Sequence, residues 1–379
     1  MKILITGSKG FVGKNLIAKL RNQGYTDLLE FDVDSIPDLL SKYARDCEFV
    51  FHLAGVNRPE KQEEFMSGNY GFTSLLINEL KKHGNKAPVL ITSSTQASLD
   101  NLYGRSKLAG EELMFQYSKD MGVPVFVYRL PNIFGKWCRP NYNSAVATFC
   151  NNIANDLPIQ VNDPNVVMNL VYIDDVVSSF IERLCSFSYA SESVINKIKC
   201  SNHFETISPQ HTVKLGEIVE FLYQFKESRN NLQVPDMSNA FTKKLYSTYL
   251  SYLPKDKFYY PLKMNIDKRG SFSEFLKSSD RGQVSINISK PHIIKGNHWH
   301  HSKNEKFLVV SGYGVIRFRK IDSEEIIEYF VSGDKLEVVD IPVGYTHNIE
   351  NLGETDMVTV MWVNEIFDKE KPDTFFLEV

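Results

Sequence analysis

Short apolar runs alternate with stretches of helical length along the first part of the chain. The runs lie at residues 2–6, 28–31, 49–53, 89–91 and 125–128. A polar or amphipathic stretch follows each run, and the first run leads into a helical pattern through Leu16, Ile17 and Leu20. Strands that alternate with helices are typical of a parallel sheet covered on both faces. We therefore predict a doubly wound α/β domain.

From about residue 261 the pattern changes to short alternating runs separated by Gly, Asp and Asn turns. These runs lie at residues 284–288, 307–310, 315–318, 326–331, 336–341 and 357–363. Many short strands with little helix indicate an antiparallel barrel or jelly roll. Aromatic residues between the two patterns, at 248–254 and 258–261, indicate a connector. We predict an α/β domain over residues 1–250 and an all-β domain over residues 251–379.

The composition fits two folded domains and excludes several partners. The chain of 379 residues is much longer than the roughly 150 residues of an average domain. Its 42% of hydrophobic and 23% of charged residues are typical of a globular protein. The net charge is -3 and the charges are intermingled, so we expect neither nucleic acid nor an anionic membrane as a partner.

The apolar runs and the cysteines indicate where the protein works. No apolar stretch has the length of a membrane-spanning helix, and the N-terminal run is too short for a signal peptide. The cysteines are widely spaced and odd in number, which fits reduced thiols better than disulfides or a metal site. They are Cys47, Cys138, Cys150, Cys185 and Cys200. We therefore expect a cytoplasmic protein.

Three glycines stand at intervals of three where the first strand gives way to the first helix. Glycine permits a tight turn there and lets the backbone approach a pyrophosphate, whose charge the helix N-terminus accepts. An ordinary strand-helix turn is the alternative, but the position at the first strand favours a Rossmann-type dinucleotide site. Its predicted residues are Gly7, Lys9, Gly10, Phe11, Val12 and Gly13.

The end of the second strand bears on the choice of cofactor. Asp32 stands there, and an acidic residue at this place usually accepts hydrogen bonds from the ribose 2′-hydroxyl of NAD. Lys9 in the glycine turn offers a contact for the 2′-phosphate of NADP. The residues alone leave open whether the cofactor is NADH or NADPH.

Tyr103 and Lys107 stand four residues apart in a predicted helix, so they share one face. An ammonium beside a phenol lowers the phenol pKa, and such a phenol can protonate the alkoxide that hydride attack on a ketone creates. Ser94, at the end of the preceding strand, offers a hydroxyl to the carbonyl. A surface Tyr and Lys paired by chance would be the better explanation for the pair in isolation.

With these motifs, the first 185 or so residues resemble an extended short-chain dehydrogenase/reductase. Further matches are His52-Leu53-Ala54-Gly55, Asn69 and the segment 129–135, Arg-Leu-Pro-Asn-Ile-Phe-Gly. The resemblance implies that Ser94 polarises the carbonyl, Tyr103 is the acid/base and Lys107 holds the ribose. It also implies cofactor contacts from Leu53, Ala54, Asn69 and Asn132. Because the extended group mostly acts on nucleotide sugars, Arg139 and the segment 141–143, with Asn143, become candidates for substrate contact.

Five of the nine histidines lie in the last quarter of the chain. His298 and His300 point the same way in a strand, Glu305 begins the next strand, and His347 arrives from a third. Three imidazoles and one carboxylate are a suitable ligand set for zinc, nickel, iron or manganese. A lone buried histidine is usually structural, but four residues at this spacing favour a metal site. His301 is expected to face away.

These segments resemble the cupin motifs, and upstream residues resemble deoxysugar 3,5-epimerases that act on dTDP-linked 4-keto sugars. The similar segments are residues 267–274, Asp-Lys-Arg-Gly-Ser-Phe-Ser-Glu, and residues 295–298, Lys-Gly-Asn-His. The resemblance implies substrate contacts from Arg269, Phe272, Glu274 and Lys295. In that family the histidine is a metal-free general base, whereas His298 here has the partners of a metal ligand. Lys295, Tyr313 and Tyr345 remain alternatives for the base at C3.

The whole chain resembles the CapF family of bifunctional UDP-2-acetamido-2,6-dideoxy-L-talose synthases, which serve capsule and O-antigen synthesis. The resemblance implies C3 epimerisation of a UDP-linked 2-acetamido-2,6-dideoxy-4-hexulose in the cupin domain, followed by C4 reduction by NAD(P)H in the reductase domain. It further implies NADPH as reductant, zinc in the cupin and a homodimer through the cupin. Two alternatives remain: a reductase with a structural metal, and a nucleotide- and metal-binding sensor or scaffold.

Overall fold

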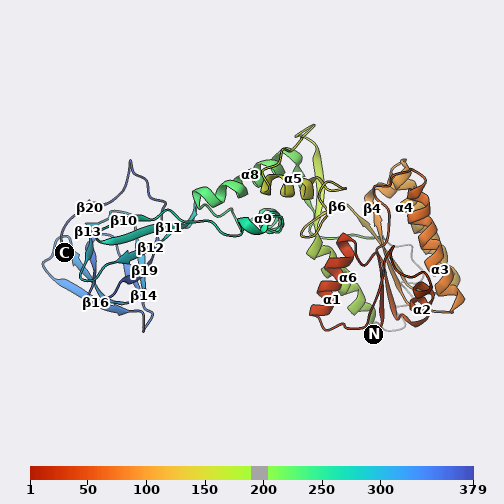
Figure 1. The fold of residues 1–379 in the computed structure, drawn as a ribbon, viewed down its shortest axis with the longest axis horizontal. Helices are drawn as coiled ribbons and strands as arrows, with labels where there is room; N and C mark the ends of the chain where they lie inside the picture. The colour runs from red at the N-terminus through yellow and green to blue at the C-terminus, as the bar shows by residue number, and fades with distance from the viewer. Residues whose placement is uncertain (189–203) are drawn as a thin grey trace. The chain divides into compact units, whose positions relative to one another are not determined.

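The computed structural model describes residues 1–188 and 204–379, and its contacts divide the chain into two compact units (Figure 1). The first unit comprises Met1–Leu222 and Lys244–Leu253, and the second comprises Tyr223–Lys243 and Pro254–Val379. The sequence placed the whole stretch up to residue 250 in one domain, whereas residues 223–243 group with the second unit. Cys200 lies outside the described residues.

A parallel sheet forms the centre of the first unit. Its strand order is β2-β1-β3-β4-β5-β8, and every neighbouring pair is parallel. The runs of apolar residues that predicted the central strands are fully buried in β1 and β3, because a doubly wound sheet is covered on both faces. The strands are β1 (Ile3–Thr6), β2 (Leu28–Phe31), β3 (Phe49–His52), β4 (Val89–Ser94), β5 (Val125–Leu130) and β8 (Phe204–Glu205).

Helices cover both faces of this sheet (Figure 1). One buried cluster joins α1 and α6 to the sheet, and a second joins α2, α3 and α4 to it. These helices are α1 (Phe11–Asn22), α2 (Asp38–Asp46), α3 (Phe72–Lys82), α4 (Leu102–Met121) and α6 (Ile173–Ser188). The prediction of a doubly wound α/β domain is confirmed.

Shorter elements complete the first unit. A three-stranded sheet has the order β6-β7-β9, in which β6 and β7 are parallel and β7 and β9 antiparallel. These strands are β6 (Asn132–Phe134), β7 (Val167–Tyr172) and β9 (His211–Lys214). Among the described residues, the other helices before the second unit's strands are η1 (Met66–Gly71), η2 (Thr95–Ser98), α5 (Ala145–Ala154), α8 (Leu215–Asn231), α9 (Ala240–Leu250) and η3 (Lys255–Lys257). Of these, η3 belongs to the second unit, and α8 and α9 each have residues in both units.

The second unit is built from two antiparallel sheets, as the alternating pattern predicted. The six-stranded sheet has the order β10-β11-β12-β19-β14-β17 and the five-stranded sheet β16-β15-β18-β13-β20. The strands are β10 (Asn265–Asp267), β11 (Gly270–Ser278), β12 (Gly282–Ser289), β13 (Ile294–Trp299), β14 (Glu305–Ser311), β15 (Tyr313–Lys320), β16 (Ile326–Ser332), β17 (Val338–Ile341), β18 (Tyr345–Asn351), β19 (Met357–Val363) and β20 (Phe375–Phe376). The architecture is that of a cupin jelly roll.

Three further expectations can be compared with the fold. The aromatic connector is wrong at its beginning, because Thr248 and Tyr249 end helix α9 and are each only 1% exposed. The four cysteines within the described residues form no disulfide. Within residues 1–188 and 204–379, no helix is both long enough and apolar enough to cross a membrane.

Candidate functional sites

The glycine turn between β1 and α1 packs closely against the end of β3. Gly7 has a φ of +69°, and a Cβ there would lie 2.7 Å from the backbone nitrogen of Ala54. A Cβ at Gly13 would lie 2.2 Å from the carbonyl oxygen of Gly7. Only glycine fits these positions, and no side chain caps the N-terminus of α1. The first N–H groups of α1 are therefore available to an anion.

A cavity of about 740 Å³ opens beside this turn, at the carboxyl ends of the parallel strands. Most of the sequence-predicted residues of the first domain line it: Gly7, Lys9, Gly10, Phe11, Val12, Gly13, Asp32, Leu53, Ser94, Tyr103, Lys107, Asn132, Arg139 and Asn143. Tyr142, from the predicted segment 141–143, lines it as well. Trp137 also lines it and was missed, although it lies two positions before the predicted Arg139. This single cavity is therefore large enough for one end of a dinucleotide cofactor together with a substrate.

Ala54 and Asn69 do not line this cavity. They border a much smaller one, of about 10 Å³, on the far side of Lys107. The amide of Asn69 accepts a hydrogen bond from the Val56 backbone (2.9 Å) and donates one to Ser106 (2.9 Å). Asn69 therefore connects the segment after β3 to helix α4, and it supports the site from behind.

The Asp32 carboxylate stabilises the glycine turn. Its carboxylate accepts hydrogen bonds from the backbone N–H of Lys9 (2.7 Å) and of Val33 (2.8 Å). The Lys9 ammonium forms an exposed ion pair with Asp34, which raises the pKa of Lys9. The carboxylate that the sequence assigned to the cofactor ribose is therefore already hydrogen-bonded to two backbone N–H groups.

Tyr103, Ser94 and Lys107 meet at one wall of the large cavity. Asn101 caps helix α4 by accepting a hydrogen bond from the Gly104 N–H (2.7 Å), which fixes the first turn that carries Tyr103. Lys107 Nζ donates to the Thr92 carbonyl (3.3 Å) and lies 5.9 Å from the centre of the Tyr103 ring. Strand β4 therefore orients the lysine next to the phenol.

Burial dominates the pKa values of this pair. It lowers the pKa of Lys107 from 10.5 to about 8, against the attraction of Glu111. It also raises the pKa of Tyr103, and a hydrogen bond with Ser94 opposes that shift. The lowering of the Tyr103 pKa that we expected from Lys107 is absent: the opposing contribution comes from Ser94, and the Lys107 ammonium lies 5.9 Å from the centre of the ring. Tyr103 therefore keeps its proton at neutral pH, as an acid must.

Two buried polar networks support this wall. Glu111 is 1% exposed, pairs with Arg129 through two hydrogen bonds (2.9 and 2.6 Å) and accepts one from Ser93 (2.5 Å). His52 bridges Thr6 and Thr73 at 2.8 Å on each side, and burial lowers its pKa to about 3. Both networks tie β-strand ends to the helices that carry the site.

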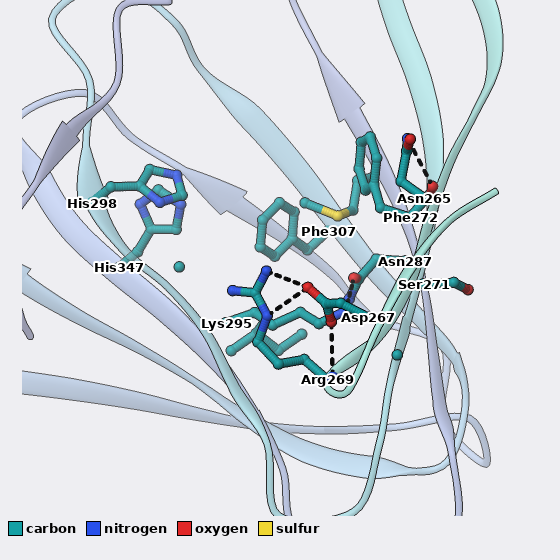
Figure 2. Close-up of a pocket in the computed structure, with 14 residues that line it drawn as sticks. Asn265, Asp267, Arg269, Ser271, Phe272, Asn287, Lys295, His298, Phe307 and His347 are labelled. Atoms are coloured by element: carbon teal, nitrogen blue, oxygen red, sulfur yellow. Dashed lines mark hydrogen bonds and ion pairs between the residues drawn. The ribbon is translucent and has the colours of Figure 1, made fainter. Parts of the chain in front are cut away.

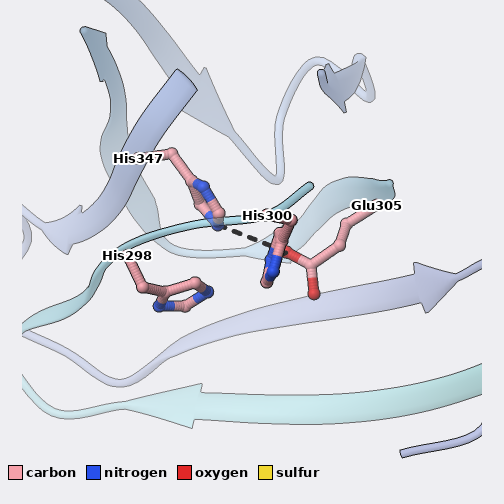
Figure 3. Close-up of side chains that lie close together, drawn as sticks. All are labelled: His298, His300, Glu305 and His347. Atoms are coloured by element: carbon pink, nitrogen blue, oxygen red, sulfur yellow. Dashed lines mark ion pairs between the residues drawn. The ribbon is translucent and has the colours of Figure 1, made fainter. Parts of the chain in front are cut away.

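In the second unit, four side chains converge on one point (Figure 3). One ligand atom from each of His298, His300, Glu305 and His347 lies within 4.8 Å of the other three. They come from β13 and the residue after it, from the first residue of β14 and from β18. The carboxylate Oε2 of Glu305 is 3.2 Å from His347 Nε2 and 3.7 Å from His300 Nε2.

The chemistry of this cluster fits a divalent metal. Three buried atoms that face one another have no hydrogen-bond partner: His300 Nε2, Glu305 Oε2 and His347 Nε2. Burial lowers the pKa of His298 to about 4, so its imidazole is neutral at pH 7. Burial would raise the pKa of Glu305, but the imidazoles of His300 and His347 lower it below its usual range. A neutral imidazole and an ionised carboxylate are protonation states that suit a metal ligand.

A cavity of about 280 Å³ lies next to this cluster and is lined by His298 and His347 (Figure 2). Arg269, Phe272 and Lys295 line it too. Lys295 Nζ donates to the Asn287 side chain (2.8 Å) and to the Ile288 carbonyl (2.9 Å), and burial lowers its pKa. Arg269 is held by Asp267 (2.6 Å). This cavity is large enough for one sugar ring.

Three candidate residues lie elsewhere. Glu274 does not line the cavity and pairs with Lys277 at 2.9 Å, next to a shift in the β11–β12 register. Tyr313 and Tyr345 are also not among its lining residues, so Lys295 is the member of the three base candidates that reaches it. His301 packs against Trp299 and Phe375, with ring centres 4.4 and 5.0 Å apart, away from the cluster.

Comparison with known proteins places the two units in families. Residues 3–186 match the NAD dependent epimerase/dehydratase family, and residues 265–375 match the polysaccharide biosynthesis C-terminal domain. The chain is therefore an NAD(P)-type short-chain dehydrogenase/reductase joined to a polysaccharide-biosynthesis cupin.

Whole-chain relatives identify the family. A Pseudomonas aeruginosa protein named UDP-2-acetamido-2,6-beta-L-arabino-hexul-4-ose reductase is 46% identical over 380 residues, covering 100% of this chain and 99% of the relative. The crystal structure of the capsular polysaccharide assembling protein CapF from Staphylococcus aureus has a TM-score of 0.92 and 55% identity, with both chains fully covered. An Escherichia coli dTDP-4-dehydro-6-deoxyglucose reductase is 26% identical over 286 residues, 63% of this chain and 86% of that protein. The protein belongs to the CapF family.

Proposed function

We propose that this protein is a bifunctional nucleotide-sugar enzyme of capsule or O-antigen synthesis. Its C-terminal unit inverts C3 of a UDP-linked 2-acetamido-2,6-dideoxy-4-hexulose, and its N-terminal unit then reduces C4 to give UDP-2-acetamido-2,6-dideoxy-L-talose. The name of the P. aeruginosa relative, a reductase of a UDP-linked 4-hexulose, supports this substrate class. The observation that carries the proposal is Ser94, Tyr103 and Lys107 on the wall of a cavity that also contains the glycine turn.

In the reductase half, each of the three residues has a separate role. When bound, the nicotinamide cofactor supplies the hydride. Ser94 donates a hydrogen bond to the C4 carbonyl oxygen, and Tyr103 gives its proton to that oxygen as the alkoxide forms. Lys107, beneath the tyrosine, holds the cofactor ribose and contributes the nearby positive charge. Arg139 and Asn143 line the same cavity and are placed to bind the sugar nucleotide.

We infer that the cofactor is NADPH or NADH, with the structure favouring NADPH. Asp32 has both carboxylate oxygens engaged by backbone N–H groups of the turn. Lys9 lines the cavity and keeps its ammonium at the surface beside Asp34. A 2′-phosphate would find a cation at this place and would not depend on a free Asp32 carboxylate.

In the epimerase half, the ketone at C4 makes the C3 hydrogen acidic, since the carbanion is delocalised as an enolate. Inversion of C3 follows when that proton leaves one face for the base and a proton that derives from solvent is added to the opposite face of the enolate. Lys295 lines the cavity, and burial lowers its pKa, which favours the neutral amine that a base requires. We assign the C3 base to Lys295.

His298, His300, Glu305 and His347 would hold a divalent metal, with zinc as the family's expected ion. When bound there, a metal would polarise an oxygen of the sugar. In solution we expect a homodimer through the C-terminal unit. One face of its six-stranded sheet carries a group of apolar side chains beside the polar Ser271, Ser273, Lys306 and Asp340. The apolar members are Ile266, Ile286, Ile288, Leu308, Val338, Val358 and Val360. Ile266 is 72% and Val338 58% exposed, so a partner surface would remove this area from water.

The experiment is deuterium incorporation by the full chain in D2O, with the 4-keto UDP-sugar and without nicotinamide. We expect deuterium at C3 by mass spectrometry and NMR. Tyr103→Phe should retain the exchange at C3, whereas its rate of NAD(P)H oxidation should fall roughly 100- to 10,000-fold. Tyr223→Phe, an exposed tyrosine, serves as the control with both activities unchanged.

The outcomes separate the competing functions. No exchange in an enzyme that still reduces the sugar would mean a single-activity reductase with a structural metal site. Loss of both activities in Tyr103→Phe would contradict independent sites. Neither exchange nor reduction in the wild type would leave a binding protein or sensor as the better description.

A further inference from the structure

The C-terminal segment crosses the strands that carry the histidine cluster. Strand β20 lies beside β13 (Figure 1). In their pairing, Phe376 lies opposite His298 and Phe375 opposite Trp299. The Leu377 N–H donates to the Asn297 carbonyl (3.0 Å), and the Thr346 hydroxyl donates to the Leu377 carbonyl. The last residues of the chain therefore form part of the sheet beside the ligands.

Just before β20, Asp373 holds the turn that joins β13 to β14. Its carboxylate accepts four hydrogen bonds from three consecutive residues: the His301 N–H (3.0 Å), the Ser302 N–H (2.9 Å), the Ser302 hydroxyl (3.0 Å) and the Lys303 N–H (2.9 Å). This turn lies between two members of the cluster, His300 and Glu305. One side chain from a distant part of the chain thus fixes the path between two ligands.

The contact is reciprocal. Lys303 is only 5% exposed, and its ammonium donates to the Pro372 carbonyl and to the Thr374 hydroxyl (3.2 Å). Lys303 of the turn thus binds the two neighbours of Asp373, while the Asp373 carboxylate binds the turn. Asp373 also has a φ of +39°, a conformation that aspartate tolerates better than most residues. A strained backbone of this kind persists where surrounding contacts over-determine it.

The backbone of Asp373 determines which ring nitrogen of His300 can bind a metal. The Asp373 carbonyl oxygen is 2.5 Å from His300 Nδ1, and a carbonyl can only accept, so Nδ1 carries the hydrogen. The other ring nitrogen, Nε2, faces Glu305 and has no hydrogen-bond partner, so it is the atom that can act as a ligand. In metalloproteins, a partner of this kind on the second ring nitrogen orients the ligand.

We propose that Asp373 is a positioning residue of the metal site: its carboxylate clamps the turn 301–303, and this holds its carbonyl against His300. The metal affinity of the C-terminal unit consequently depends on a residue that does not touch the metal. This inference rests on the proposed metal site and extends it to the C-terminal segment.

The test measures metal binding by the full chain after the metal has been stripped from it. Co²⁺ is titrated while its d–d absorption is followed, and Zn²⁺ affinity is obtained by competition with a chelator. Asp373→Gly removes the clamp and tolerates the positive φ. Asp373→Asn keeps the size but places an N–H group against the backbone donors. Asp368→Asn is the matched control, because this exposed carboxylate of the same segment accepts a hydrogen bond from the local Glu370 N–H (2.9 Å) and from no other donor among the described residues.

We expect Asp373→Gly to weaken metal binding by roughly 10- to 100-fold and Asp373→Asn by about 10-fold. Asp368→Asn should stay within about twofold of the wild type. In a His300→Ala background, Asp373→Gly should add less than about twofold, because the clamp acts through His300. The Co²⁺ spectrum of Asp373→Gly should also move towards that of His300→Ala.

The results distinguish failure of the proposed metal site from failure of the proposed role of Asp373. If the wild type takes up no Co²⁺ or Zn²⁺, the proposed metal site fails. If the wild type binds and Asp373→Gly binds within about threefold of it, the metal site stands and the clamp is wrong. Additive effects of Asp373→Gly and His300→Ala would also overturn it. Should Asp373→Gly not fold, Asp373→Asn decides by the same criteria.

Discussion

Lys107 is predicted to destabilise the protein in the absence of nucleotide. Burial lowers its pKa from 10.5 to about 8, so the folded protein disfavours the protonated lysine. A pKa difference of this size corresponds to a loss of at most roughly 3 kcal/mol in the free energy of unfolding. The value is a limit because Lys107 borders a cavity and retains some contact with solvent. Lys107→Met removes the charge and keeps the length of the side chain.

The sign of this effect follows from the two pKa values. Below about pH 8 the lysine is protonated in both states, and the folded state bears the whole penalty. Between about pH 8 and 10.5 the penalty declines, and above 10.5 the amine is neutral in both states. Lys107→Met also loses the hydrogen bond to the Thr92 carbonyl (3.3 Å), worth about 1 kcal/mol. The net gain is therefore about 2 kcal/mol at pH 7 and becomes a small loss above pH 10.5.

The assay is thermal and urea unfolding of the full chain at pH 7 and pH 10, without nucleotide. We expect the transition of the N-terminal unit to rise by several degrees at pH 7 in Lys107→Met, and the difference from wild type to shrink at pH 10. Lys119→Met, an exposed lysine of the same helix, should change stability by less than about 0.5 kcal/mol. A loss of stability at pH 7, or a gain that does not depend on pH, would refute the electrostatic reasoning.

Three further predictions concern both units. Glu111→Gln breaks a buried pair with Arg129 and should cost roughly 3 kcal/mol of unfolding free energy in denaturant titrations, whereas no loss would mean that the pair is neutral overall. Lys9→Met should raise the KM for NADPH about 10-fold more than that for NADH, and equal changes would place the 2′-phosphate elsewhere. Removal of metal by a chelator should lower the melting temperature of the C-terminal unit, and added Zn²⁺ should restore it; an unchanged melting temperature would contradict a structural contribution from the cluster.

The parts of the fold that the sequence predicted are those with a local signal. The strands of the central sheet are short apolar runs because both sheet faces are covered, and β2 spans the predicted residues 28–31. His298 and His300 stand two positions apart, so strand periodicity predicts that they point the same way, and Glu305 follows five positions later at the start of the next strand.

The parts that were missed depend on contacts between distant segments. Asp373 meets Ser302 across 71 positions, and nothing near Asp373 in the sequence indicates the turn that it holds. Tyr249 was assigned to a connector because aromatic residues and a proline surround it, whereas helix α9 buries it. Glu274 was assigned to the substrate from a motif, but the register shift between Glu274 and Leu276 changes the pairing of β11 at that point. Strand pairing and burial decide these positions, and a single sequence does not encode them locally.

The proposed activities must act in a fixed order, because both require the same ketone. The C4 carbonyl makes the C3 hydrogen acidic, and reduction by the Tyr103 site removes that carbonyl. A sugar that is reduced first can no longer be epimerised. The stereochemistry of the product therefore records whether the C-terminal unit has acted. With the wild type in D2O, the reduced sugar should carry deuterium at an inverted C3. With Lys295→Met, any reduced sugar should keep hydrogen and the original configuration there. Inversion with full deuterium in Lys295→Met would assign the base to another residue while leaving the order intact.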